Sequence, residues 1–264
     1  MIINFLYESI MKKITSILFV LLLMMASFTA GLEYPRGDVD QDGQVTVADV
    51  TCLIDYLLTG TWEEEPVTPP DTHEYVDLGL PSGTLWATCN VGATAPEEYG
   101  DYFAWGETEP KDVYDWTTYK WCNGSNNTMT KYCTSSRYGT VDNKKELDPE
   151  DDAAYVNWGS SWRMPSLEQQ QELIDNCTWT WIIQNGVNGR LVTGSNGKSL
   201  FLPAAGTRCS SLLEGAGSWG DCWSRTLKSS SNAYYVYFES GKVYWIDNYR
   251  YIGNTVRAVR VPQN

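Results

Sequence analysis

The sequence is poor in the groups on which many enzyme sites depend. His73 is the only histidine among 264 residues, and 19 lysines and arginines stand against 33 aspartates and glutamates, giving a net charge of −14. This acidity speaks against nucleic acid or an anionic membrane surface as a partner, because both require a basic footprint. The chain also lacks a GxSxG nucleophile elbow and a phosphate-cradling glycine loop. These absences leave catalysis without support from any motif.

Long hydrophobic runs are scarce, and the one present lies near the N-terminus. Two lysines precede an apolar run from Ile14 to Met25, and small residues follow it. This order is typical of an export signal, predicted over residues 1–31, with the true start at Met1 or Met11. The run is marginal for a membrane-spanning helix, and no other stretch is long enough. We therefore expect an exported protein with no membrane span after signal removal, located in the periplasm, at the cell surface or outside the cell.

Paired CxxC spacing is also absent, which argues against zinc in a chain with one histidine. Seven cysteines in an exported chain predict disulfides with one thiol left over. Cys52 is the odd one by position, and short loops favour the pairs Cys122–Cys133 and Cys209–Cys222. The six cysteines available for pairing are Cys89, Cys122, Cys133, Cys177, Cys209 and Cys222.

Oxygen-bearing side chains recur over Asp38–Asp49 at the spacing of a calcium loop. Alternate positions at the start of the loop carry carboxylates, Gly43 permits the sharp turn, and the next residue offers its backbone carbonyl. The predicted metal ligands are Asp38, Asp40, Asp42, Gln44, Thr46 and Asp49. A helix is expected from Val50 to Leu58, where apolar residues repeat at helical spacing before Gly60. A solvated acidic turn is the alternative, but this spacing followed by an amphipathic helix favours calcium.

The loop and its one following helix resemble a type I dockerin repeat, the calcium-dependent module that docks proteins onto cohesin domains. The resemblance covers Gly37 to Gly60 and includes Asp49 at the last ligand position, where an EF-hand carries glutamate. It implies a dockerin-like repeat over residues 32–60, with Ca²⁺ as cofactor and a cohesin-like protein as candidate partner. Val47 and Ala48 lie where dockerins present part of their recognition surface, although such residues also suit a core. The second repeat that dockerins normally carry is not found.

The rest of the chain is predicted to form a spacer and one larger domain. Residues 61–73 combine acids and prolines, which indicates an extended linker. From residue 74 to residue 264, short apolar and aromatic runs alternate with Gly, Asn and Ser, as in a loop-rich α+β domain. A helix is predicted to start at Ser166, where Gln169 completes a capping box, and a second over residues 148–157. The predicted strands are Ser199–Pro203, Ala233–Glu239, Lys242–Ile246 and Thr255–Val261, the last three as an antiparallel meander, with hairpin turns over Gln184–Asn196.

Five sequence blocks follow one another in order along this domain. They are EYVDLGLPSGTLWATCNVGA (74–93), YGDYFAWGET (99–108), WGSSWRMPS (158–166), SLFLPAAGTR (199–208) and TVRAVR (255–260). The series resembles the Fibrobacter succinogenes major paralogous domain, which is abundant in exported proteins of Bacteroidetes and Fibrobacteres. That family has no established common activity. Its wider relatives imply a C-type-lectin-like fold with antiparallel strands and one or two helices.

These features predict an exported, non-catalytic interaction protein. It would bind calcium through the dockerin-like loop and a glycan or surface protein through the large domain, whose many aromatic rings suit either sugar stacking or a core. The alternatives are a polysaccharide-acting enzyme recruited by the dockerin-like module and a structural surface or fimbrial subunit. Asp101, Glu107 and Glu109 are clustered acids that suggest a glycosidase pair, although solvated or ion-paired acids are the simpler interpretation.

Overall fold

The chain divides into two units, Met1–Pro69 and Pro70–Asn264. The structure, a computed structural model, describes residues 73–260, all of which belong to the second unit. The predicted export signal, calcium loop and nearly all of the linker lie outside the described residues. Within residues 73–260, no helix is both long enough and apolar enough to cross a membrane.

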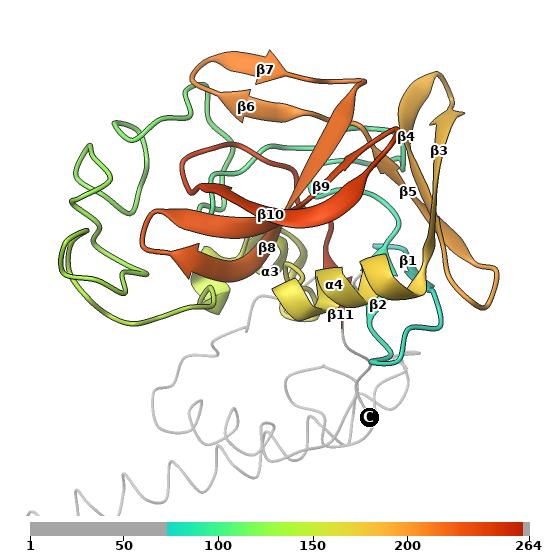
Figure 1. The fold of residues 1–264 in the computed structure, drawn as a ribbon, viewed down its shortest axis with the longest axis horizontal. Helices are drawn as coiled ribbons and strands as arrows, with labels where there is room; N and C mark the ends of the chain where they lie inside the picture. The colour runs from blue at the N-terminus through green and yellow to red at the C-terminus, as the bar shows by residue number, and fades with distance from the viewer. Residues whose placement is uncertain (1–72, 261–264) are drawn as a thin grey trace, which may run out of the picture. The chain divides into compact units, whose positions relative to one another are not determined.

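Antiparallel strands dominate the described residues, with two α-helices and one short 3-10 helix (Figure 1). The loop-rich α+β class is thereby confirmed at this coarse level. The helices are η2 Pro149–Asp151, α3 Ala153–Trp158 and α4 Leu167–Asn176. The strands are β1 Tyr75–Asp77, β2 Leu85–Ala87, β3 Thr178–Gln184, β4 Val187–Thr193, β5 Ser199–Pro203, β6 Thr207–Cys209, β7 Leu212–Glu214, β8 Trp219–Ser229, β9 Asn232–Glu239, β10 Val243–Tyr249 and β11 Val259–Arg260.

Helix α4 forms where its capping signals predict it. The Ser166 side chain accepts the backbone N–H of Gln169 at 3.2 Å, and the Gln169 side chain accepts the backbone N–H of Ser166 at 2.9 Å. This reciprocal pair satisfies two N–H groups that a helix start otherwise leaves without partners. Leu173 then turns into a hydrophobic cluster shared with Val236 and Phe238 of β9, so α4 covers that sheet.

The central sheet has the strand order β10-β9-β8. The turn at Ser240 and Gly241 joins β9 to β10 as predicted. The predicted meander is wrong in its third strand, because β10 is left at the edge of the sheet and residues 255–260 contribute only β11. Strand β11 pairs with β2 instead, with Val259 opposite Trp86. The segment does not pair with β10, because Thr255–Val259 are all buried in the core between the sheets.

A second sheet of order β3-β4-β5 lies to the right of the central sheet in Figure 1. Its first hairpin turns through Asn185 and Gly186, whose φ angles are 49° and 85°. Two successive positive φ angles are the signature of a tight hairpin turn whose twist matches the strands, and Asn-Gly adopts it readily. The hairpin expected within Gln184–Asn196 is therefore confirmed.

The core contains two arginines that are fully buried, Arg250 and Arg257. The Arg250 guanidinium donates to the Tyr119 hydroxyl and to the Ser230 carbonyl, both at 2.8 Å, and lies 5.0 Å from the Trp105 ring centroid. A buried cation is tolerated only when its N–H groups find acceptors. Arg250 thus ties the loop around Tyr119 to the end of the β8–β9 hairpin.

Candidate ligand-binding surface

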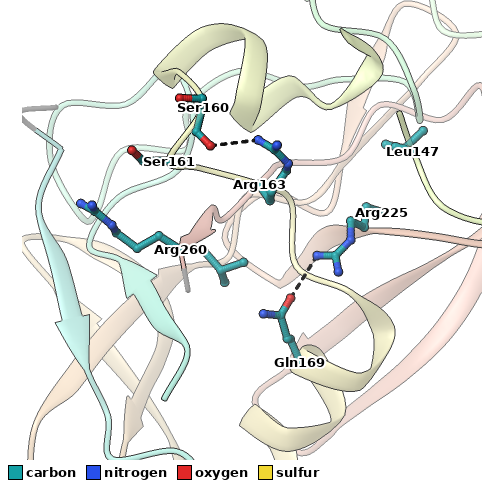
Figure 2. A pocket seen from close by; sticks show the side chains of 8 residues that line it. Leu147, Ser160, Ser161, Arg163, Gln169, Arg225 and Arg260 are labelled. Atoms are coloured by element: carbon teal, nitrogen blue, oxygen red, sulfur yellow. Dashed lines mark hydrogen bonds between the residues drawn. The ribbon is translucent and has the colours of Figure 1, made fainter. Parts of the chain in front are cut away.

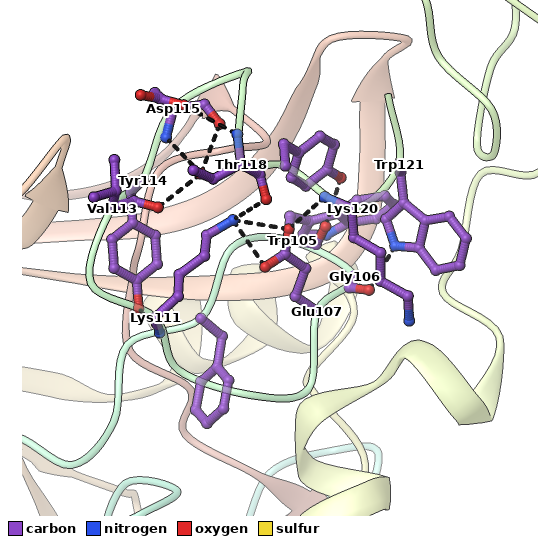
Figure 3. Close-up of polar contacts among 12 residues, drawn as sticks. Trp105, Gly106, Glu107, Lys111, Val113, Tyr114, Asp115, Thr118, Lys120 and Trp121 are labelled. Atoms are coloured by element: carbon purple, nitrogen blue, oxygen red, sulfur yellow. Dashed lines mark hydrogen bonds and ion pairs between the residues drawn. The ribbon is translucent and has the colours of Figure 1, made fainter. Parts of the chain in front are cut away.

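Glu107, one of the acids that suggest a glycosidase pair, is held in an ion pair. Glu107 is buried and forms an ion pair with Lys111 at 2.9 Å, and it also accepts the backbone N–H of Lys120 at 2.8 Å (Figure 3). The Lys111 ammonium also donates to the Thr118 carbonyl at 3.1 Å. These contacts pin the loop after Glu107 to itself and neutralise its charge. Glu107 therefore has an architectural role, in keeping with the simpler interpretation.

The other two clustered acids are less buried than Glu107. Glu109 is exposed, and Asp101 lies at a cavity of about 310 Å³ that Lys111 and Arg208 also line. A retaining or inverting glycosidase needs two carboxyl groups that face each other across the scissile bond. Of the three acids, Glu107 is engaged by Lys111, while Asp101 lies at the cavity and Glu109 at the surface.

A different group of acids, Asp148, Glu150 and Asp151, comes close enough together to suggest a metal site. A lysine ammonium already occupies this position: Lys131 Nζ lies 2.6 Å from Asp148 Oδ2, 2.6 Å from Asp151 Oδ2 and 3.4 Å from Glu150 Oε1. Burial opposes ionisation of these groups, but their hydrogen bonds outweigh it, raising the pKa of Lys131 and lowering that of Asp148. The cluster is an ion-pair network.

The six described cysteines are all free, so the predicted pairs Cys122–Cys133 and Cys209–Cys222 are not formed. The thiols of Cys122 and Cys133 each donate to a nearby backbone carbonyl, and the Cys222 thiol lies 3.3 Å from the Thr255 hydroxyl in the core. Closeness in sequence failed as a guide because each thiol is directed to its own polar neighbour. Burial raises the pKa of Cys122 and Cys222, which keeps them as unreactive thiols.

Strand β10 carries an exposed row of large apolar side chains. Tyr244, Trp245, Ile246 and Tyr249 keep 40%, 42%, 39% and 44% of their surface exposed. A strand normally alternates buried and exposed residues, but β10 is the edge of its sheet and both of its faces remain partly open. Three consecutive exposed apolar residues are more than an edge strand requires for its own packing.

The rings on this hairpin are held in place by each other. On one face, Tyr237 and Tyr244 are paired across the strands with ring centroids 5.2 Å apart. On the opposite face, Tyr234 and Trp245 meet edge to face at 5.6 Å. Tyr249 continues the row and stacks on Tyr251 at 5.6 Å. These rings lie on the two opposite faces of the hairpin, beside the open edge of β10. We call Tyr234, Tyr237, Tyr244, Trp245 and Tyr249 together the β10 aromatic surface.

Polar groups lie beside these rings. Asn232 donates to Asp247 at 3.0 Å, and the Tyr237 hydroxyl donates to Glu239 at 2.6 Å. Burial, reinforced by the hydrogen bond to Glu239, raises the pKa of Tyr237 and keeps its hydroxyl protonated. Rings flanked by carboxylates and amides match the two-sided character of a sugar, which has an apolar C–H face and a polar rim. Cross-strand ring pairs also stabilise a hairpin by themselves, so exposure is the feature that points to a ligand.

The predicted calcium ligands and the predicted partner-binding residues Val47 and Ala48 lie outside the described residues. The calcium ligands are Asp38, Asp40, Asp42, Gln44, Thr46 and Asp49. Sequence reasoning did not single out the β10 aromatic surface. Its signal was the run Tyr244-Trp245-Ile246 directly after a hairpin turn, where alternation of polar and apolar residues breaks down.

Comparison with known proteins gives no relative: no family model matches the chain, and no curated protein or solved structure matches it.

Proposed function

We propose that this protein is an exported, non-catalytic binding protein whose large domain holds a glycan against the β10 aromatic surface. The carrying observation is that four large apolar side chains of one edge strand remain about two-fifths exposed. Aromatic rings stack on the C–H face of a pyranose, and neighbouring acids and amides bind its hydroxyls. The antiparallel, loop-rich architecture supports the C-type-lectin-like fold that the sequence blocks imply.

The proposal includes calcium binding by the dockerin-like repeat. Its support is the donor set itself: four carboxylates, a threonine hydroxyl and a backbone carbonyl within one short loop suit a hard cation that prefers oxygen. Repulsion among these acids opposes loop closure until the cation neutralises it, so binding and folding of the repeat are coupled. A cohesin-like protein is the candidate partner of this repeat.

A glycan-array screen of the full-length mature chain, with and without calcium, tests the proposal. Binding of any glycan that is retained is then compared in W245A and Y244A, with I183A as the matched control, because Ile183 is an apolar residue 69% exposed on β3. Because Tyr244 and Trp245 lie on opposite faces of β10, loss of the ring on the face that holds the glycan should weaken binding on the order of tenfold, and loss of the other ring should have little effect. I183A should bind as the native chain does.

The other outcomes separate the alternative functions. If mass spectrometry shows that a bound glycan is cleaved, the protein is a polysaccharide-acting enzyme and the assignment as a binding protein is wrong. If no glycan binds and an extended peptide binds along the open edge of β10, the partner is a protein that pairs with β10 by strand addition. Glycan binding unaffected by W245A and Y244A would refute the assignment to this surface.

A further inference from the structure

A cavity of about 310 Å³, lined in part by the loop that follows Glu107, carries charges of both signs. Its charged lining residues are Asp101, Lys111, Asp112 and Arg208. The cavity shares no residue with the β10 aromatic surface, and its size falls at the lower end of the range of small-molecule sites. Which of these charges are already neutralised by the protein decides what ligand the cavity suits.

Among these four residues, Lys111 alone forms an ion pair within residues 73–260. Its ammonium lies 2.9 Å from Glu107 Oε2 and donates to the Thr118 carbonyl at 3.1 Å (Figure 3). It also lies 5.5 Å from the Tyr114 ring centroid. Glu107 is buried and does not line the cavity, so it neutralises Lys111 without adding a charge to the lining.

The Arg208 guanidinium is placed against an aromatic ring and has no carboxylate partner. Its Cζ lies 5.1 Å from the Tyr102 ring centroid. In the part of the chain that the structure describes, it forms no ion pair and its N–H groups have no acceptor. Burial raises the pKa of Tyr102 and Tyr114, and the positive charge of Arg208 opposes this at both hydroxyls. The ring positions the guanidinium and leaves its charge available for a ligand.

The Asp101 carboxylate lies at the same cavity and packs against the backbone of a glycine. A Cβ at Gly92 would lie 2.4 Å from Asp101 Oδ2, so the missing side chain leaves room for the carboxylate. Within residues 73–260 this carboxylate accepts no hydrogen bond and forms no ion pair. Its charge acts on the Tyr114 hydroxyl in the direction opposite to that of Arg208. Both unpaired charges are therefore within electrostatic reach of one ring of the lining.

Asp112 adds a second carboxylate at the rim of the cavity. It is exposed, and it has no ion pair or hydrogen-bond donor among the described residues. Because Lys111 is neutralised by Glu107, the charges left in the lining are those of Asp101, Asp112 and Arg208. Two carboxylates thus stand against one guanidinium, and the cavity favours a ligand with more positive than negative groups.

The charges around the larger cavity in Figure 2, of about 350 Å³, differ in that they have partners. Arg225 pairs with Glu146 at 2.9 Å. Arg163 donates to the Trp162 carbonyl at 2.8 Å, and its charge acts on the buried carboxyl group of Asp152. The smaller cavity is therefore the better candidate for a charged ligand.

We infer that the cavity at Asp101 and Arg208 binds a basic amino acid such as lysine, which carries two ammonium groups and one carboxylate. The Arg208 guanidinium would bind the carboxylate through parallel N–H donors, and Asp101 and Asp112 would bind the ammonium groups. The hydroxyls of Tyr102 and Tyr114 already donate to backbone carbonyls, so their rings are left to pack against the aliphatic part of the ligand. The inference goes beyond the proposed function and does not depend on the β10 aromatic surface.

Calorimetric titration of the full-length mature chain at low ionic strength tests this inference with three probes. Lysine carries all three charged groups, cadaverine lacks the carboxylate, and norleucine lacks the side-chain ammonium. We expect saturable binding of lysine that weakens at high salt, and weaker binding of the other two probes.

Two variants separate the roles of the charges. R208Q should weaken binding of lysine about tenfold or more without weakening that of cadaverine, because only lysine has a carboxylate for the guanidinium. D101N should weaken binding of both probes, since both carry ammonium groups. R137Q and E168Q are the matched controls and should bind as the native chain does, because Arg137 and Glu168 are exposed and do not line the cavity.

A third variant keeps the test decisive if R208Q or D101N does not fold. Asp112 is exposed, so D112N should fold normally and weaken binding of lysine on the order of threefold. The inference is overturned if lysine shows no saturable binding, if norleucine binds as tightly as lysine, or if the folded variants among R208Q, D101N and D112N bind lysine as the native chain does.

The same chemistry is offered by the free amino acid and by a lysine at the C-terminus of a peptide. Nα-acetyl-lysine separates the two, because it keeps the carboxylate and the side-chain ammonium and loses the α-ammonium. Weaker binding of this probe than of lysine would support a site for the free amino acid. Equal binding would support the site and assign it to peptide C-termini as well.

Discussion

Replacing Asp221 with asparagine measures the cost of a carboxyl group buried without a partner. Asp221 lies in β8 and is 2% exposed, and its Oδ1 has no hydrogen-bond partner in the described part of the chain. Burial raises its pKa to about 8, against about 3.9 in an unfolded chain. The carboxyl group is therefore neutral in the folded domain at a pH where it is ionised after unfolding.

The sign of the pH dependence follows from this difference. Because the folded pKa is the higher one, the stability linked to Asp221 is fully present below about pH 4 and is lost as the pH rises to about 8. The slope across this window is about 1.4 kcal/mol per pH unit. Between pH 5 and pH 7, about 3 kcal/mol of unfolding free energy is lost through this one residue.

Asparagine keeps the shape of the side chain and does not ionise. In D221N this contribution to the pH dependence should vanish, so the difference in unfolding free energy between variant and native protein should shift by about 3 kcal/mol in favour of the variant from pH 5 to pH 7. The amide brings its own unsatisfied N–H groups, which cost about 1–3 kcal/mol at every pH. The comparison therefore uses the change with pH in the unfolding free energy of D221N relative to the native protein, and not the value at a single pH.

Urea unfolding followed by tryptophan fluorescence at pH 5, 6, 7 and 8 provides this measurement. D112N is the control, because Asp112 is exposed. The control should run parallel to the native protein. If the D221N and native curves also run parallel between pH 5 and pH 7, the reasoning about burial is refuted.

Three further predictions concern other parts of the chain. K131M should lower the unfolding free energy by about 3 kcal/mol, because the buried Asp151 carboxylate loses the closer of its two ammonium partners and keeps only Lys120, 3.6 Å away. Urea unfolding beside K144M, which removes a more exposed lysine of the same network, checks this. R250M should lower the unfolding free energy by about 3 kcal/mol in the same assay, since four oxygen acceptors lose their donor. An effect below about 1 kcal/mol would contradict this. Calcium removal by a chelator should increase protease cleavage within residues 37–60 alone. The variant D40N should show the same increase in the presence of calcium. Unchanged cleavage would count against the calcium loop.

Local chemistry explains the elements that the sequence predicted. The capping box at Ser166 and Gln169, the Asn185-Gly186 turn and the turn at Ser240-Gly241 all depend on residues adjacent in sequence, and each forms as expected. The acidic loop from Asp38 to Asp49 is a prediction of the same local kind. It lies outside the described residues and remains a prediction.

Strand β8 shows where local pattern was insufficient. It is the longest strand within residues 73–260, yet it lacks polar and apolar alternation because Asp221 and Ser224 are buried along with its apolar residues. Only coverage of both of its faces makes such a strand stable, and that coverage comes from distant segments. The pairing of β11 with β2, in place of a meander, has the same origin.

By itself, the sequence determined the composition class, the local turns and caps, and the spacing of the expected calcium ligands, because each depends on neighbouring residues or on total charge. Tertiary structure decided which strands pair, that Lys131 neutralises the acids around Asp151, and that Arg163, Arg225 and Arg260 share one cavity. Those arginines come from three segments far apart in sequence. No local periodicity carries information about such a meeting, since it is fixed by how the sheets and loops pack around the common core.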